Sequence, residues 1–122
     1  MKTDETRNLV EAYFRAWSGG DCDRARTMVA DDLKLVTPMN SYDTADAMIP
    51  VLKQISGMMK KSTLLRSVVE GDHAVLFHET VFPEPAGTMR SMEIYKVANG
   101  KIRSIDMIYD PTGLKLLRTR AA

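Results

Sequence analysis

The chain has 122 residues, and 44% of them are hydrophobic. This is enough for one domain with a single core and too little for two domains of ordinary size, so we expect one domain over residues 1–122. The 17 Lys and Arg residues nearly balance the 16 Asp and Glu residues, and the resulting net charge of +1 excludes the basic surface by which nucleic-acid-binding proteins neutralise phosphates.

The first predicted elements are two helices. Apolar residues recur at helical spacing between Thr3 and Ser18, at Leu9, Val10, Tyr13, Phe14 and Trp17. Gly19 and Gly20 can adopt the left-handed conformation that ends a helix, and Asp21 can cap the next one. The inner face of this second helix would consist of Ala25, Met28 and Val29.

A short strand and a third helix are expected next. The segment "LKLVTP", residues 33–38, alternates as a strand does and ends at Pro38. Residues 44–59 return to helical spacing through Met48, Leu52, Ile55 and Met59. Thr44 or Asp43 is the expected cap, and Pro50 should kink this helix or delay its start because proline lacks the backbone donor.

The pattern of the remaining chain is typical of strands. Apolar residues recur at every second position over residues 64–70, 73–82, 88–98 and 101–110. Gly71-Asp72 separates the first two segments, and Asn99-Gly100, a strong hairpin signal, separates the last two. We expect an α+β fold in which three helices precede a four-stranded antiparallel meander, with the early strand in the same sheet. Residues 111–122 could form a short helix or a loose tail.

Cysteine content and the N-terminus bear on chemistry and location. Cys22 cannot form an intramolecular disulfide, and no Cys or His residues have the spacing of a zinc site. The first residues, "MKTDETRN", contain no apolar signal core, and no apolar run approaches the roughly 20 residues of a membrane helix. We expect a cytoplasmic protein with no metal, no cofactor and no membrane partner.

Three motifs occur in an order that resembles a known superfamily. The segments "YFRAWSGGD", "ADDLKLVTP" and "NGKIRSIDMIYD" resemble the nuclear transport factor 2-like superfamily, which includes SnoaL-like polyketide cyclases and ketosteroid isomerases. The resemblance covers Leu9 to Asp110. It implies a cone: a strongly curved, mostly antiparallel sheet, wrapped by about three N-terminal helices around a hydrophobic cavity, with the outer sheet face buried in a homodimer.

The strand pattern agrees with a sheet that is covered on both faces. Apolar residues alternate onto both sides of residues 74–82, with Leu76 and Phe82 on one side and Val75, Phe77 and Val81 on the other. A sheet with one solvated face would alternate more cleanly between apolar and polar residues. Helices would cover one face, and a second copy of the chain could cover the other.

The isomerase pattern carries over to this sequence only in part. In that family a tyrosine on the first helix, eight residues before the aspartate of the "GD" turn, donates a hydrogen bond to the developing enolate, and Tyr13 matches it. The family's general base, an aspartate just before the proline that ends the first strand, corresponds to Thr37. Its second oxyanion donor, a protonated aspartate, corresponds to Met92. We therefore do not expect the ordinary ketosteroid isomerase mechanism.

The same register assigns side chains to the two faces of the sheet. Glu79, Glu93 and Asp106 would face outward, and a slip of one residue would exchange the faces. The expected ligand-binding residues in and around the cavity are Trp17, Pro38, Thr80, Phe82, Arg90, Met92, Ile105, Met107 and Tyr109, with Tyr13 and His78 as the candidate catalytic pair. Ile94 would face the cavity as well.

His78 is the titratable group of this predicted cavity. Histidine readily takes or gives a proton near neutral pH, and with Tyr13 bound to a carbonyl oxygen it could move a proton from the adjacent carbon. It could equally be a core histidine satisfied by a neighbouring hydroxyl. The nine methionines could either surround a ligand or fill the core completely.

Three functions follow as expectations. The first is a protein that binds a small hydrophobic molecule and acts as an isomerase or cyclase by proton transfer on a carbonyl compound. The second is a binding module that holds a lipophilic ligand without chemistry. The third is a dimerisation module whose outer sheet face, including Val75, Phe77, Glu79 and Val81, is the functional surface.

Overall fold

The computed structural model describes residues 2–121, with side chains described through residue 117. Its helices and strands follow the order α1 (Lys2–Ser18), α2 (Cys22–Arg26), β1 (Val29–Val36), β2 (Ser41–Tyr42), α3 (Ala45–Met58), β3 (Lys61–Glu70), β4 (His73–Val81), β5 (Thr88–Ala98), β6 (Lys101–Ile108) and α4 (Thr112–Ala121).

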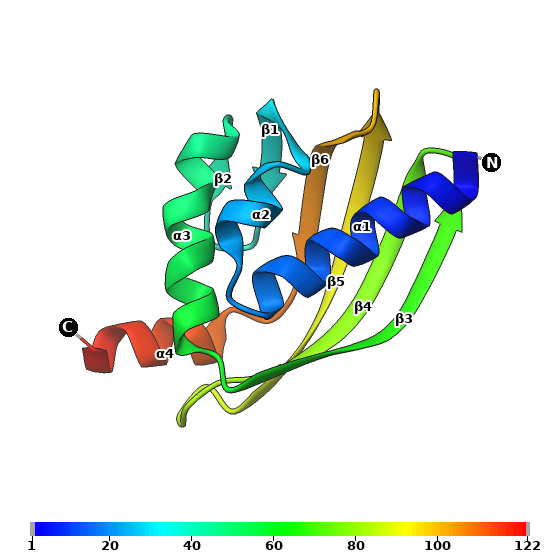
Figure 1. Cartoon of the computed structure of the whole chain (residues 1–122). Helices are drawn as coiled ribbons and strands as arrows, with labels where there is room; N and C mark the ends of the chain where they lie inside the picture. Colours follow the sequence, from blue (N-terminus) through cyan, green and yellow to red (C-terminus); the bar gives the residue numbers. More distant parts are fainter. Residues whose placement is uncertain (1, 122) are drawn as a thin grey trace.

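One curved sheet contains all six strands in the order β2-β1-β6-β5-β4-β3. Strands β3 to β6 form the expected antiparallel meander, and β1 joins it parallel to β6. The sheet does not close, and the N-terminal helices lie against its concave side, with α1 crossing the long strands and α3 standing beside β1 (Figure 1). This confirms the predicted cone-shaped α+β fold.

Two predicted helix caps are present. The Asp21 side chain caps α2 by accepting a hydrogen bond from the Arg24 backbone N at 3.1 Å. The Thr44 hydroxyl caps α3 by accepting from the Ala47 backbone N at 3.1 Å. Pro50 lies inside α3 without delaying its start, because the Thr44 cap satisfies an amide of the first turn and fixes where the helix begins.

The second helix is shorter than predicted. It ends at Arg26, so Met28 and Val29 do not belong to its inner face. The backbone O of Met28 accepts from the N of Ile102, and Val29 pairs with Ile102 as the first residue of β1. Met28 and Val29 are extended because they form backbone hydrogen bonds with β6. These hydrogen bonds stabilise the strand more than the helical spacing of a few apolar residues stabilises a helix.

The hairpin between β5 and β6 contains a bulge in β6 that changes which residues of β5 and β6 share a face. Asn99 and Gly100 form the turn with φ values of 54° and 72°, as an Asn-Gly hairpin turn requires. Lys96 pairs with Ser104 but Val97 pairs with Ile102, so Arg103 is an extra residue in β6. Beyond the bulge the pairing is shifted by one residue, so that Met107 lies opposite Glu93, whereas a regular hairpin would place it opposite Met92.

The prediction for β5 is therefore wrong. Ser91, Glu93 and Tyr95 point into the cone and are buried, whereas Arg90 and Met92 are exposed on the outer face. On β4 the predicted faces are correct, because His78, Thr80 and Phe82 are buried inside. The prediction for β5 assumed regular pairing beyond the two-residue Asn99-Gly100 turn. The extra residue Arg103 in β6 shifts this pairing, and the turn sequence does not indicate it.

Candidate active site

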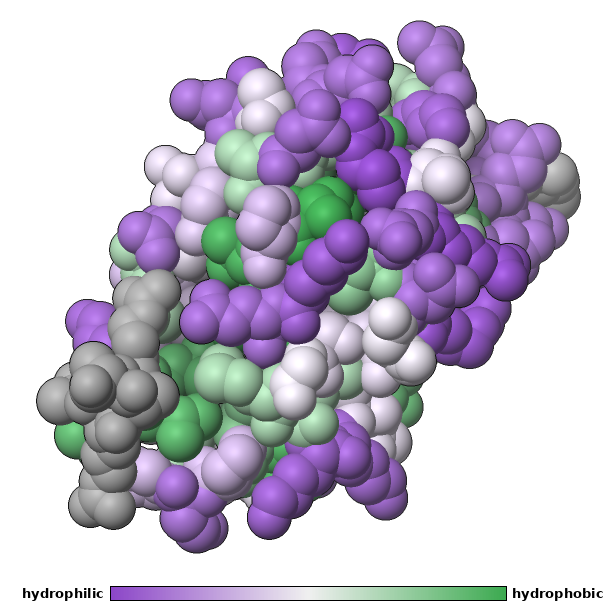
Figure 2. All heavy atoms as spheres, turned by 60° about the vertical axis from the view of Figure 1, so that its left-hand side comes forward, coloured by the Kyte–Doolittle hydropathy of each residue, from purple (hydrophilic) through white to green (hydrophobic). Residues whose placement is uncertain are grey.

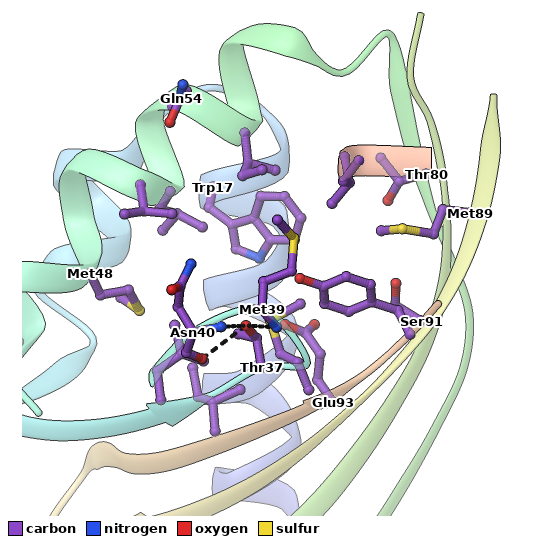
Figure 3. A pocket seen from close by; sticks show the side chains of 18 of the residues that line it. Trp17, Thr37, Met39, Asn40, Met48, Gln54, Thr80, Met89, Ser91 and Glu93 are labelled. Carbon is purple, nitrogen blue, oxygen red and sulfur yellow. Dashed lines mark hydrogen bonds between the residues drawn. The ribbon is translucent and has the colours of Figure 1, made fainter. Parts of the chain in front are cut away.

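A pocket of about 160 Å³ lies inside the cone between α3 and the sheet (Figure 3). Tyr13 and Trp17 of α1 contribute to it, and α3 contributes mainly apolar side chains. The sheet contributes buried polar groups, namely His78 and Thr80 from β4 and Ser91 and Glu93 from β5. The pocket is therefore apolar on its helical wall and polar in one region of its strand wall.

His78 and Glu93 form a close pair in this polar region. The Nε2 atom of His78 lies 3.0 Å from Oε1 of Glu93, and these residues are 2% and 3% exposed. This distance is short enough for an ion pair, although the direction of the contact is not that of a hydrogen bond. The pair is thus a close contact between an imidazole and a carboxylate.

Neighbouring hydroxyl groups fix the orientation of the pair. The Tyr95 hydroxyl donates to Oε1 of Glu93 at 2.9 Å. On the other side of the ring, Nδ1 of His78 lies 3.3 Å from the Thr80 hydroxyl, which in turn is 2.9 Å from the Ser62 hydroxyl. Both ends of the pair are therefore held by side chains of the sheet, as a positioned acid-base group requires.

Tyr13 lies beside this cluster. Among the described residues its hydroxyl donates to the sulfur of Met48, at 3.8 Å, and its ring packs edge-on against Tyr95 with centroids 6.0 Å apart. Burial raises the pKa of the Tyr13 phenol well above its ordinary value, and the nearby carboxylate of Glu93 raises it further. Burial likewise raises the pKa of Tyr95, with Glu93 as the second cause. Both phenols stay protonated, so each remains a hydrogen-bond donor.

Most of the predicted site residues meet at this pocket. Besides Tyr13 and His78, the lining includes the predicted residues Trp17, Thr80, Phe82, Ile105, Met107 and Tyr109. They come from α1, from the strands β4 and β6 and from the segments that follow these strands, which converge because the sheet curves around α1 (Figure 1).

Three predicted residues lie elsewhere. Pro38 is exposed, and its neighbours Thr37 and Met39 line the pocket instead. The Arg90 guanidinium pairs with Glu79 at 3.1 Å on the outer face and lies over the Phe77 ring. Met92 is 40% exposed on the same face. The bulge in β6 explains why Arg90 and Met92 lie on the outer face. Pro38 points outward because side chains alternate between the two faces after the inward-facing Leu35.

Sequence reasoning missed Ser91 and Glu93 as pocket residues. A carboxylate between apolar residues on a strand is the signal that could have identified Glu93, since buried strand faces rarely carry one without a partner. At Thr37, where the isomerases have their base, the hydroxyl is engaged in a turn, donating to the Asn40 carbonyl at 2.9 Å and accepting from the Met39 and Asn40 amides (Figure 3).

The rim of the pocket lies on the side of α3 and α4. Asn40 and Gln54 are exposed lining residues, and Leu114 of α4 is a buried one. The space-filling view of this side shows apolar patches between polar residues (Figure 2). Gly113 lets α4 approach the loop between β4 and β5, since a Cβ there would be 3.0 Å from Ala86 Cα. The helix α4 therefore closes one end of the pocket.

Within residues 2–121, no group of three or more His, Cys, Asp and Glu side chains is placed to hold a metal ion. No helix in this part of the chain is long and apolar enough to cross a membrane.

Comparison with solved structures places the fold among related proteins. A protein from Kribbella flavida is 28% identical, with a TM-score of 0.86 and 93% of each chain covered. A putative ketosteroid isomerase from the same organism is 14% identical, with a TM-score of 0.79 and coverage of 90% of this chain and 81% of that one. A putative polyketide cyclase from Sinorhizobium meliloti is 19% identical, with a TM-score of 0.75 and coverage of 83% and 94%.

The likeness to the isomerase and the cyclase concerns the fold, which supports many activities. A search of the curated proteins finds no match. The sequence model of the SnoaL-like domain matches residues 10–105, most of the chain. The chain therefore belongs to the SnoaL-like family of the nuclear transport factor 2-like superfamily.

Proposed function

We propose that this protein binds a small hydrophobic carbonyl compound and catalyses proton transfer at the carbon next to the carbonyl group, as an isomerase or cyclase. The observation that carries the proposal is the His78–Glu93 pair, at 3.0 Å and buried, on the wall of an otherwise mainly apolar pocket. Titratable pairs buried in a ligand-sized pocket are characteristic of acid-base sites.

The pair can take and return one proton. With a neutral imidazole and an ionised carboxylate, it carries one negative charge and has room for one proton. After accepting a proton from the substrate carbon it becomes an imidazolium and a carboxylate, which stabilise each other across 3.0 Å. Returning the proton to a different carbon completes an isomerisation without any other reactant.

Tyr13 supplies the donor that such a reaction needs. Removal of the proton leaves negative charge on the carbonyl oxygen, and a fixed donor in an apolar site stabilises that charge. The Tyr13 hydroxyl is protonated and is bound to a thioether, which is a weak acceptor. A substrate oxygen would therefore be a better partner than the one it has.

The experiment measures hydrogen exchange at the substrate carbon. Cyclic ketones and β,γ-unsaturated ketones are incubated with the protein in D₂O, and deuterium uptake and double-bond migration are followed by mass spectrometry. We expect uptake faster than in buffer, and a decrease of about 100-fold or more in Glu93→Gln, His78→Asn and Tyr13→Phe. Met89→Leu, a volume-conserving change in the same pocket, should retain the activity.

A second candidate function is ligand binding without chemistry. It is favoured by the loss of the isomerase carboxylate at Thr37, whose hydroxyl now stabilises a turn. Ketones that bind to the folded protein without any gain in deuterium uptake would establish this function and refute proton transfer.

A further inference from the structure

The pocket contains buried polar atoms without a hydrogen-bond partner, and those of Trp17 and Ser91 lie outside the acid-base pair. Among the described side chains, the buried polar atoms without a hydrogen-bond partner are Trp17 Nε1, His78 Nε2 and Ser91 Oγ. All three residues line the pocket, and each is at most 4% exposed. A buried polar atom without a partner destabilises the fold, and such atoms are rare in folded proteins.

These atoms belong to neighbouring side chains. Ser91 is the direct cross-strand partner of His78 in the β4–β5 ladder. The rings of Trp17 and His78 meet edge-on with centroids 6.0 Å apart. Figure 3 shows Trp17 reaching into the pocket from the helical side, with Ser91 on the strand side. The unpartnered atoms thus surround one region of the pocket from both walls.

Their chemistry specifies the ligand atom that would satisfy them. The indole N–H of Trp17 can only donate, and the Ser91 hydroxyl can donate as well. A ligand oxygen with lone pairs, such as a carbonyl oxygen, is the matching group. The remaining wall is soft and apolar, with side chains such as Met39, Met58, Met89 and Met107 that adapt to an uncharged body.

The volume limits the size of that body. At about 160 Å³ the pocket resembles an engineered cavity of about 150 Å³ that binds benzene, and it falls below the roughly 300–1,000 Å³ of pockets for drug-sized ligands. Leu114 and α4 close one end. The space therefore suits a molecule the size of one ring rather than a four-ring steroid.

We infer that the pocket selects a compact, uncharged ketone of single-ring size, whose oxygen accepts hydrogen bonds from the Trp17 Nε1–H and the Ser91 hydroxyl in addition to that from the Tyr13 hydroxyl. The inference names the substrate class of the proposed function. That this ligand is also converted rests on the proposed function, whereas its binding does not. Trp17 and Ser91 are anchoring groups in this inference and take no part in moving the proton.

The test compares matched ligands by calorimetry or ligand-detected NMR. Cyclohexanone and methylenecyclohexane have nearly the same shape, but only the ketone can accept a hydrogen bond. We expect the wild type to bind the ketone about 10-fold more tightly. In Trp17→Phe and Ser91→Ala this preference should fall several-fold, whereas affinity for the alkene should change little. Leu65→Met, at an exposed residue that does not line the pocket, should keep the preference.

A size series completes the test. Cyclohexanone, 2-decalone and a four-ring steroid ketone are compared on the wild type, and affinity should fall as the ring number rises. Equal binding of the ketone and the alkene would overturn the anchor, and binding of the steroid at least as tight as that of cyclohexanone would overturn the size limit. Because the wild-type comparisons need no variant, they remain decisive even if Trp17→Phe does not fold.

The two proposals fail in different ways. Ketone-selective binding that depends on Trp17, without deuterium uptake at the substrate carbon, would refute proton transfer and support the anchor. Deuterium uptake that is unchanged in both Trp17→Phe and Ser91→Ala, with the ketone preference also unchanged, would refute the anchor and support proton transfer.

Discussion

Nε2 of His78 lies 3.0 Å from Oε1 of Glu93, on adjacent strands and away from solvent. Replacement of either residue should affect the other, because the two side chains are in direct contact inside the cone. If the two act as one proton-transfer group, their kinetic effects should not add. We expect His78→Asn, Glu93→Gln and the double variant to lose similar factors in kcat.

The measurement is a double-mutant cycle on a ketone found in the exchange experiment. Gln keeps an oxygen that can accept from Tyr95, so the fold should survive Glu93→Gln, which circular dichroism can verify. Losses that multiply in the double variant would show that the two residues act independently.

Alkaline pH should destabilise the protein through its buried tyrosines. The pKa values of Tyr13 and Tyr95 are raised in the folded state above the ordinary value of 10.0. Below pH 10 both states hold these protons, and the contribution is constant. Above pH 10 the unfolded chain releases them first, so stability falls by about 1.4 kcal/mol per pH unit for each buried phenol.

Urea unfolding between pH 9 and 11.5 measures this slope. Tyr13→Phe should reduce the loss above pH 10, since it removes one of the two phenols. A stability curve for Tyr13→Phe parallel to that of the wild type over this range would contradict the assignment.

Gly113→Ala should detach α4 from the rest of the molecule. A Cβ at this position would lie 3.0 Å from the Cα and 3.1 Å from the O of Ala86, both backbone atoms that cannot move easily. We expect a loss of about 1–3 kcal/mol in stability and faster ligand release, because Leu114 on the same helix closes the pocket.

Gly57→Ala in α3 is the matched control. A Cβ at this position would meet no atom within 4 Å beyond its own helix and chain neighbours. Alanine also favours a helix over glycine, so stability should stay the same or rise by up to about 1 kcal/mol. Thermal unfolding compares the two variants. Equal effects of both changes would show that the contact with Ala86 does not hold α4.

We expect the outer face of the sheet to form the interface of a homodimer. Val36, Val68, Met92 and Ile108 expose between 40% and 58% of their surface on the strands, and Met92 lies opposite Ile108 in the ladder. Exposed apolar residues that gather on one face mark an interaction surface. We expect the wild type to sediment as a dimer and Met92→Lys as a monomer.

Leu116→Lys provides the control, because Leu116 is 50% exposed but lies on α4. Analytical ultracentrifugation should show this variant as a dimer. A wild type that remains monomeric at high concentration, or a dimer unaffected by Met92→Lys, would contradict an interface on this face.

The fold followed from local signals of the sequence. The stripe through Tyr13 and Trp17, the Asp21 and Thr44 caps and the Asn99-Gly100 turn each act over a few residues, and the structure confirms them. They suffice because helix spacing, capping and turn geometry depend on neighbours in the chain. The short helix α2 is the exception, since pairing between Val29 and Ile102 ends it early.

The identity of the polar pair was decided by the tertiary structure. The sequence by itself determined that His78 faces inward, because β4 alternates without interruption. It could not determine that Glu93 meets His78, because the extra residue Arg103 in β6 places Glu93, instead of Met92, opposite the pocket residue Met107. A bulge forms where strand pairing and burial favour it, and both depend on residues that are far apart in the chain. Local sequence patterns therefore do not predict it. The single extra residue Arg103 makes Glu93, which was expected to face outward, the partner of the buried His78.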